Sequence, residues 1–233
     1  MELTLDFTTI LLLGGAALLA GFIDAIAGGG GMLIMPALLS TGMPPHLVVG
    51  TNKLIGTFGI FSASLIFIRK GLFKPGLWWA MSFGTLVGAL FGAVLIYLLS
   101  AGTLKTLLPL AILLASGYLI WPRRTPPAQA MPRPEATPTG RRGVKLLTGG
   151  LIGFYDGFIG PGTGAFWMAA AMKLFHLDLV AAAGVARFMN FVSNLTALLT
   201  FVILGNIDYT VGLTMGATLM LGAFVGAHSA IRY

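Results

Sequence analysis

Long apolar runs occupy most of the chain, and charged residues gather in the gaps between them. Seven of these runs are the main candidates for membrane-crossing helices, which need about 20 apolar residues. They cover residues 11–27, 48–68, 77–99, 104–121, 146–159, 185–204 and 211–230. The runs lack the alternating ~10-residue pattern of outer-membrane barrel strands. We therefore predict an all-α, polytopic membrane protein.

Two shorter apolar runs, 32–40 and 165–175, differ from the others. Each has too few residues to cross ~30 Å of hydrocarbon as a helix that rises ~1.5 Å per residue. Each also follows a glycine-rich stretch that interrupts a longer apolar segment. This pattern indicates one broken helix in each half of the chain.

Composition supports the membrane assignment and removes other classes of protein. Of 233 residues, 57% are hydrophobic and 9% are charged, and the mean hydropathy is +0.92, which excludes a water-soluble globule and a disordered chain. The sequence has no cysteine, so disulfides, thiolate metal sites and cysteine nucleophiles are absent. Because no Walker loop, zinc-binding pair or Ser/His/Asp set is found either, we expect no enzyme activity, metal or cofactor.

A basic, proline-rich segment joins the fourth and fifth long runs. Residues 121–145 contain six of the 14 basic residues and six of the 12 prolines, against one acid, Glu135. A basic loop between apolar blocks faces the cytoplasm under the positive-inside rule, so we do not expect a nucleic-acid partner. The predicted parts are a first transmembrane repeat at 1–121, a cytoplasmic linker at 122–145 and a second repeat at 146–233.

Loop charge also predicts the orientation of the chain. Arg69, Lys70 and Lys74 follow the second long run and should face the cytoplasm together with the linker. The N-terminus then lies on the cytoplasmic side as well, provided that each short segment enters and leaves the membrane on the same side.

The two halves align with each other residue by residue. A shift of 132 places residues 21–24, GFID, on 153–156, GFYD, and a shift of 134 places Gly50 on Gly184 and Lys53 on Arg187. The run at 104–121 has no counterpart in the second half. We therefore expect the last helix to be missing, either because the chain is truncated or because a partner surface covers the gap.

Glycines carry the first candidate site. Gly28, Gly29, Gly30 and Gly31 form a run within an apolar segment. The shift of 132 places Gly28 and Gly30 on Gly160 and Gly162, in a second break that also contains Thr163 and Gly164. Such backbone leaves amides unpaired and survives at membrane depth only around a cavity or inside protein. The short helices that follow would point their N-terminal N–H groups at that cavity, which favours an anion. Close helix packing is the alternative, and we prefer it for the series Gly84, Gly88 and Gly92.

Cations and amides form the second candidate site. Thr51, Asn52 and Lys53 open one apolar run, and Arg187, Asn190 and Asn194 lie on one face of its counterpart. Intramembrane cations are costly unless they are paired, reach the interface or meet a ligand. We expect these side chains to bind an anion, and snorkelling to lipid phosphate stays open as the alternative.

Asp24 and Asp156 are the acids within the long apolar runs, at equivalent positions of the repeat. An intramembrane carboxylate is either a proton carrier or the partner of a buried cation. Both interpretations stay open here, the second with Lys53 and Arg187 as partners.

The stretches GFIDAIAGGGGMLIMPALLSTGMPPHLVVGTNK and GFYDGFIGPGTGAFW resemble the sulfite exporter TauE/SafE family, also named for toluene sulfonate uptake permeases. The resemblance covers nearly the whole chain. It implies a bacterial inner-membrane transporter of two related four-helix halves that moves sulfur-containing anions such as sulfite, sulfonates, sulfoacetate or thiosulfate. The family's final helix is absent from this sequence.

The function predicted from the sequence is transport of a small anion between the two repeats by alternating access, with Asp24 and Asp156 as candidates for proton coupling. The expected partners are the lipid bilayer and the anionic substrate, and a homodimer stays open. An anion channel and a membrane-embedded assembly factor remain the alternative functions.

Overall fold

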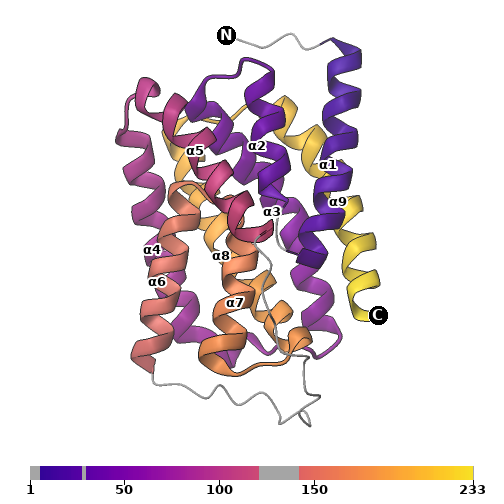
Figure 1. The fold of residues 1–233 in the computed structure, drawn as a ribbon, viewed down its shortest axis with the longest axis vertical. Coiled ribbons are helices and arrows are strands. Elements are labelled where there is room, and N and C mark those ends of the chain that lie inside the picture. Colours follow the sequence, from indigo (N-terminus) through magenta and orange to yellow (C-terminus); the bar gives the residue numbers. More distant parts are fainter. Residues whose placement is uncertain (1–5, 28–29, 121–141, 233) are drawn as a thin grey trace.

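The computed structural model describes residues 6–27, 30–120 and 142–232, and the regular structure within these ranges is entirely helical (Figure 1). The predicted all-α class is confirmed. The helices, in chain order, are α1 (Phe7–Ala27), α2 (Gly31–Ser40), α3 (Pro45–Arg69), the 3-10 helix η1 (Pro75–Trp78), α4 (Trp79–Leu98), α5 (Ala101–Ile120), α6 (Arg142–Phe158), α7 (Thr163–Phe175), α8 (Leu179–Leu204) and α9 (Tyr209–Arg232).

Six helical segments of the described chain are long and apolar enough to cross a membrane: α1, α3, α4 with η1, α5, α8 and α9. The predicted run at 146–159 forms part of α6, which has 17 residues and is shorter than a typical span of about 20. The two short apolar runs become α2, with 10 residues, and α7, with 13.

The outer surface of the bundle is apolar, as expected for helices that face lipid. Phe7, Leu98 and Ile203 are 79%, 71% and 84% exposed, and many other leucines and phenylalanines lie on the same outer surface. A water-soluble protein rarely exposes apolar area on this scale. The charged side chains Lys53, Asp156 and Arg187 lie instead in the interior.

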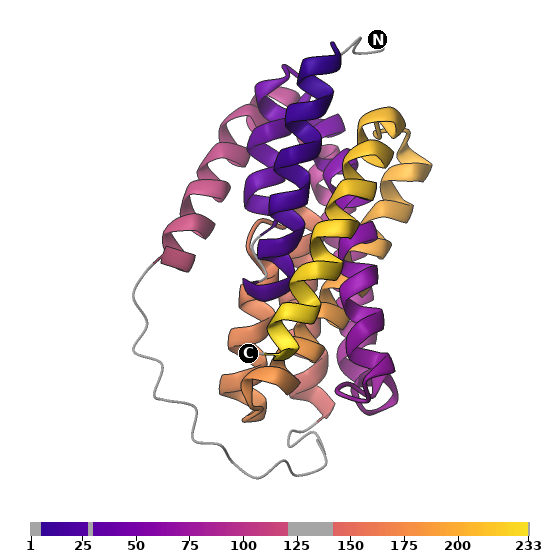
Figure 2. The same ribbon diagram turned by 90° about the vertical axis from the view of Figure 1, so that its right-hand side faces the viewer.

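Glycines let two pairs of helices pack with their backbones in close contact. A Cβ atom at Gly88 in α4 would lie 2.1 Å from the carbonyl oxygen of Gly150 in α6, and one at Gly222 in α9 would lie 2.0 Å from that of Leu18 in α1. Only glycine permits such an approach, which favours helix association in lipid. Helix α4 therefore packs along α6 (Figure 1), and α9 packs along α1 (Figure 2).

The start of α1 lies opposite the basic loops. In Figure 1, α1 begins at the upper end of the bundle, whereas the α3–α4 connection and the start of α6 lie at the lower end. If Arg69, Lys70 and Lys74 face the cytoplasm, α1 begins on the other side of the membrane. The expectation that the N-terminus lies on the same side as these loops is wrong, because α2 runs from the inner end of α1 back to the upper end and α3 descends from there.

The last four residues of the predicted linker, 142–145, belong to a helix. Residues 121–141 lie outside the described ranges, but α6 begins at Arg142, so 142–145 are helical. The reason is packing against two tryptophans: the Lys145 ammonium lies 5.2 Å from the ring centroid of Trp78, and the Arg142 guanidinium lies 5.8 Å from that of Trp79. These contacts extend α6 at its basic end.

Candidate functional site

A pocket lies inside the bundle, where the α1–α2 and α6–α7 connections meet the long helices α3 and α8. Its volume is about 420 Å³, including its open mouth. It is lined by predicted site residues from both halves, namely Asp24, Gly30, Gly31, Asn52, Lys53, Asp156, Gly160, Gly162, Thr163, Gly164, Asn190 and Asn194. Helices from both ends of the sequence thus converge on one polar space inside an apolar bundle.

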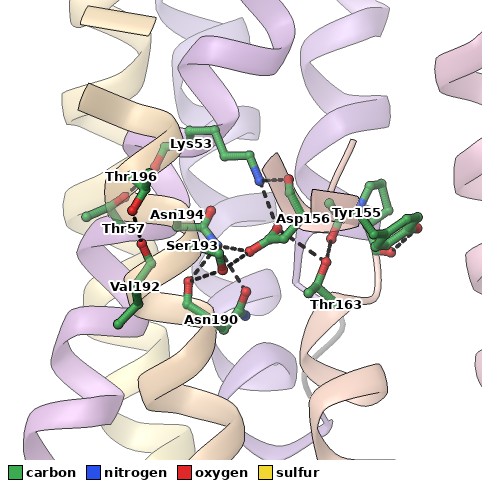
Figure 3. Close-up of polar contacts among 12 residues, drawn as sticks. Lys53, Thr57, Tyr155, Asp156, Thr163, Asn190, Val192, Ser193, Asn194 and Thr196 are labelled. Carbon is green, nitrogen blue, oxygen red and sulfur yellow. Dashed lines mark hydrogen bonds and ion pairs between the residues drawn. The ribbon is translucent and has the colours of Figure 1, made fainter. Parts of the chain in front are cut away.

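Asp156 is the most densely bonded side chain at the pocket (Figure 3). The Lys53 ammonium pairs with its Oδ1 at 2.8 Å and also donates to its backbone oxygen. Thr163 Oγ1 donates to Oδ1 at 3.2 Å, and Asn194 Nδ2 donates to Oδ2 at 3.0 Å. Ser193 Oγ also donates to Oδ2. The buried carboxylate is therefore compensated by one cation and three neutral donors.

The helices explain why Lys53 reaches this position. Asp156 lies in the last turn of α6, which ends at Phe158, so its carbonyl lacks the next helical turn as a partner. A cation at a helix C-terminus satisfies such carbonyls and interacts favourably with the helix dipole. Lys53, from α3 of the first half, supplies that cation, and its side chain is 1% exposed.

Glycines shape the α6–α7 connection around the ammonium group. Gly160 and Gly162 have φ values of +94° and +76°, in the left-handed region that residues other than glycine rarely adopt. A Cβ atom at Gly160 would lie 2.7 Å from Lys53 Nζ. Both the backbone conformation and the space for the lysine thus require glycine here.

Asparagine amides provide donors that the protein does not use itself. Asn52 is 7% exposed, and its side chain makes no hydrogen bond with any described residue. Asn194 Nδ2 donates to Asn190 Oδ1 at 3.0 Å, which leaves Asn190 Nδ2 without a partner among the described residues. Neither amide is among the fully buried unpaired atoms of the described chain, so both N–H groups face the open space of the pocket and can donate to a ligand there.

The first turn of α7 adds backbone donors. Among the residues that the structure covers, the N–H groups of Thr163 and Ala165 bond to the carbonyls of Gly160 and Gly162, but the Gly164 N–H has no carbonyl partner. Gly164 lines the pocket, so the positive end of α7 points at it. Together with the free asparagine amides, this turn can hold an oxyanion.

Arg187 and Thr51, predicted as pocket residues, do not line it. Arg187 is 2% exposed and donates to the carbonyl of Ala25 through Nε at 3.2 Å and also through Nη2. Thr51 Oγ1 instead accepts a hydrogen bond from the Asp208 N–H. Gly28 and Gly29, the first half of the glycine run, lie outside the described residues.

Other lining residues were missed by sequence reasoning. They are Ile34, Gly56, Ile60 and Leu219. Ser193, which donates to Asp156 without lining the pocket, was also missed. Ser193 carried a usable signal, because it is a polar residue next to Asn194 and three positions after Asn190 in an apolar run. The apolar residues carried none, since lipid-facing and pocket-facing leucines look alike in a sequence. In the described ranges no three His, Cys, Asp or Glu side chains come close enough to hold a metal ion.

Comparison with known proteins assigns the chain to a family. The sequence profile of the Sulfite exporter TauE/SafE family matches residues 13–233. The chain belongs to this family. A probable membrane transporter protein of Haemophilus influenzae is 39% identical over 227 residues, which is 97% of this chain and 86% of the relative. The probable membrane transporter protein YfcA of Escherichia coli K12 is 36% identical over 93% of this chain and 77% of its own length.

More distant relatives extend this likeness beyond these two bacteria. A probable membrane transporter protein of Bacillus subtilis, YunE, is 24% identical over 96% of this chain and 88% of its own length. No solved structure matches the chain. The TauE/SafE membership predicted from the motifs is confirmed, and the protein is a multi-pass membrane protein of a transporter family with bacterial relatives.

Proposed function

We propose that the protein carries a small sulfur-containing anion of the sulfite, sulfonate, sulfoacetate or thiosulfate class across the bacterial inner membrane by alternating access. Proton coupling through Asp24 or Asp156 is part of the proposal. The observation that carries it is the pocket between the two halves, where the amides of Asn52, Asn190 and Gly164 have N–H groups with no partner in the described part of the chain. Unpaired donors that converge on a pocket are the groups that fix the position of a polar ligand.

Packing of the helices supports an internal duplication. The contact of Gly88 with Gly150 joins α4 to α6, and the contact of Leu18 with Gly222 joins α1 to α9. A shift of 134 relates Gly88 to Gly222, and a shift of 132 relates Leu18 to Gly150, so the two contacts are equivalent. Because α1 starts at the upper end of Figure 1 and its counterpart α6 at the lower end, the proposed repeats are inverted.

Inverted repeats favour a carrier with a central site. In such folds the substrate binds near the bilayer midplane between interrupted helices, and one repeat rocks against the other. The cations Lys53 and Arg187, at equivalent repeat positions, each contact the interrupted helix of the opposite half, at Asp156 and at Ala25. These crossed contacts would break or form as the halves move, which couples the motion to the charge in the site.

A flux assay tests this proposal. The purified protein is reconstituted into proteoliposomes and screened for counter-exchange of sulfite, a sulfonate, thiosulfate and sulfate. We expect saturable exchange of at least one sulfur anion. Asn52→Ala removes a donor to a charged ligand, about 1.5–3 kcal/mol, and should weaken apparent affinity by about 10–100-fold. Leu113→Ala, at a lipid-facing position in α5, serves as the matched control.

The alternatives give different results in the same assay. A channel would pass current down a gradient without saturable counter-exchange. An assembly factor would show no flux for any anion in the panel. Either outcome in well-folded wild-type protein contradicts the proposed carrier.

A further inference from the structure

Asp24 and Asp156 occupy equivalent positions of the repeat, but their surroundings differ. Asp156 accepts hydrogen bonds from the side chains of four residues, Lys53, Thr163, Ser193 and Asn194. Asp24 is also buried, at 8% exposure, yet within the described ranges its carboxyl group accepts a single hydrogen bond, from the Gly30 N–H at 2.8 Å. Neutralising the two acids would therefore have unequal consequences.

A proton on Asp156 would be costly. It would disturb the two hydrogen bonds accepted by the protonated oxygen and leave the Lys53 ammonium buried without its counter-charge. A proton on Asp24 has no such cost, because no described cation lies in ion-pair contact with that carboxyl group. Geometry thus separates a structural acid from one that is free to exchange a proton.

Arg187 is placed to respond to the charge of Asp24. It attracts the Asp24 carboxylate electrostatically, but its Nε and Nη2 donate to the neighbouring Ala25 carbonyl. Its third nitrogen, Nη1, is buried and has no partner among the residues described. This arrangement is the one expected beside a protonated Asp24. When Asp24 is ionised, the Arg187 Nη1 group is available to donate to its carboxylate.

We propose that Asp24, and not Asp156, binds and releases the proton coupled to anion transport, and that Arg187 is the counter-charge that turns onto the Asp24 carboxylate when the proton leaves. The inference rests on the proposed transport function. The proton passes from the carboxyl group to water on one side of the membrane. Arg187 Nη1 then donates to the carboxylate, which reproduces in the first half the contact that Lys53 makes with Asp156 in the second.

Charge balance links this proton to the anion. The charged residues that line the pocket are Asp24, Asp156 and Lys53. Arg187 lies beside Asp24 and adds a second positive charge, so the sum is zero with both acids ionised and +1 with Asp24 protonated, and the protonated state attracts an anion more strongly. The anion therefore enters together with the proton, and the pair leaves together.

No other described titratable group faces Asp24 from the helices around it. Helix α8 contributes Arg187, α3 contributes Lys53, and α6 contributes Asp156 across the pocket. Helix α2 has no titratable residue. In α9, His228 is exposed and bonds to the carbonyl of Phe224 within its own helix. The pH response of transport is therefore assigned to Asp24 and its counter-charge Arg187.

The test compares Asp24→Asn with Asp156→Asn in proteoliposomes, with methanesulfonate as a probe that stays ionised at all working pH values. Two quantities are measured: counterflow without a pH gradient, and accumulation driven by a gradient of one pH unit. Coupling to one proton supports about tenfold accumulation in the wild type. We expect Asp24→Asn to keep counterflow and lose accumulation, and Asp24→Glu to restore accumulation with a shifted pH profile.

Several results would overturn the assignment. One is gradient-driven accumulation that persists in Asp24→Asn. Another is loss of both counterflow and accumulation in that variant, because Asp24 would then be a binding residue. If Asp24→Asn does not fold, Asp24→Glu decides alone: an unchanged pH profile removes Asp24 from coupling. Failure of the proposed function itself looks different, because the wild type would then show no counterflow of any sulfur anion, and the coupling assignment would fall with it.

Discussion

Breaking the Lys53–Asp156 ion pair is the sharpest perturbation of the interior. Both side chains are almost fully buried, at 1% and 2% exposure, and Nζ lies 2.8 Å from Oδ1. Lys53→Met keeps a long unbranched side chain but leaves Asp156 with only its neutral donors. Asp156→Asn leaves the ammonium with a backbone oxygen and a neutral amide. Each single variant thus strands one buried charge, and the double variant strands none.

The expected magnitudes follow from that difference. Removing one partner of a buried pair costs about 3–5 kcal/mol. Lys53→Met should fall at the lower end, about 3 kcal/mol, because Thr163, Ser193 and Asn194 still donate to the carboxylate. For a chain of this size that corresponds to a fall in Tm of about 6–12 °C. The double variant should be more stable than the sum of the single losses predicts, by about 2 kcal/mol or more.

The wild type, the two single variants and the double variant form a double-mutant cycle. Thermal unfolding of each detergent-purified protein, followed by fluorescence-detected gel filtration, measures its stability. Lys105→Met is the matched control, since Lys105 is exposed in α5, and it should change stability by less than about 0.5 kcal/mol. If the losses in the double variant simply add, or if Lys53→Met melts with the wild type, the two side chains do not form a buried pair.

Other predictions concern the scaffold. Gly88→Ala should push α4 away from Gly150 in α6 and cost about 1–3 kcal/mol, whereas Gly15→Ala, in open space on α1, should be neutral or stabilise by up to about 1 kcal/mol; melting curves of the two variants compare them directly. Asp178→Ala removes the N-cap of α8, where Oδ1 accepts the Ala181 N–H at 2.8 Å, and should lower stability by about 1 kcal/mol in the same assay; an unchanged Tm would show that the cap is dispensable.

Much of the fold follows from the sequence because bilayer-spanning helices leave a long apolar signature. All nine predicted apolar runs coincide with helices of the described chain, and helix ends differ by a few residues. The ends were less predictable where tertiary contacts decide them, as at α6, which Trp78 and Trp79 extend toward Arg142. The direction of α2 could not be predicted from the sequence either, because no charged residues flank this 10-residue helix to indicate its orientation.

The candidate site was predictable in its residue types and less so in its pairing. Three sequence features pointed to nearly every polar residue that lines the pocket: the glycine-rich breaks, the asparagines and the intramembrane charges. Sequence could not tell that Lys53 reaches across to Asp156 or that Arg187 turns to the carbonyl of Ala25, since both contacts join residues more than 100 positions apart. Such contacts depend on how α3 and α8 cross, which the repeat pattern alone leaves open.

Thiol labelling tests the proposed anion site most directly, because the sequence contains no native cysteine. Ile60→Cys places a single thiol in the pocket lining without removing a donor, and Ala101→Cys places one at the exposed start of α5 as the control. The labelling rate of each thiol by a maleimide is measured in membranes with increasing sulfoacetate or methanesulfonate. We expect saturable protection at position 60 and none at position 101. Labelling at position 60 that no sulfonate slows would contradict an anion site in this pocket.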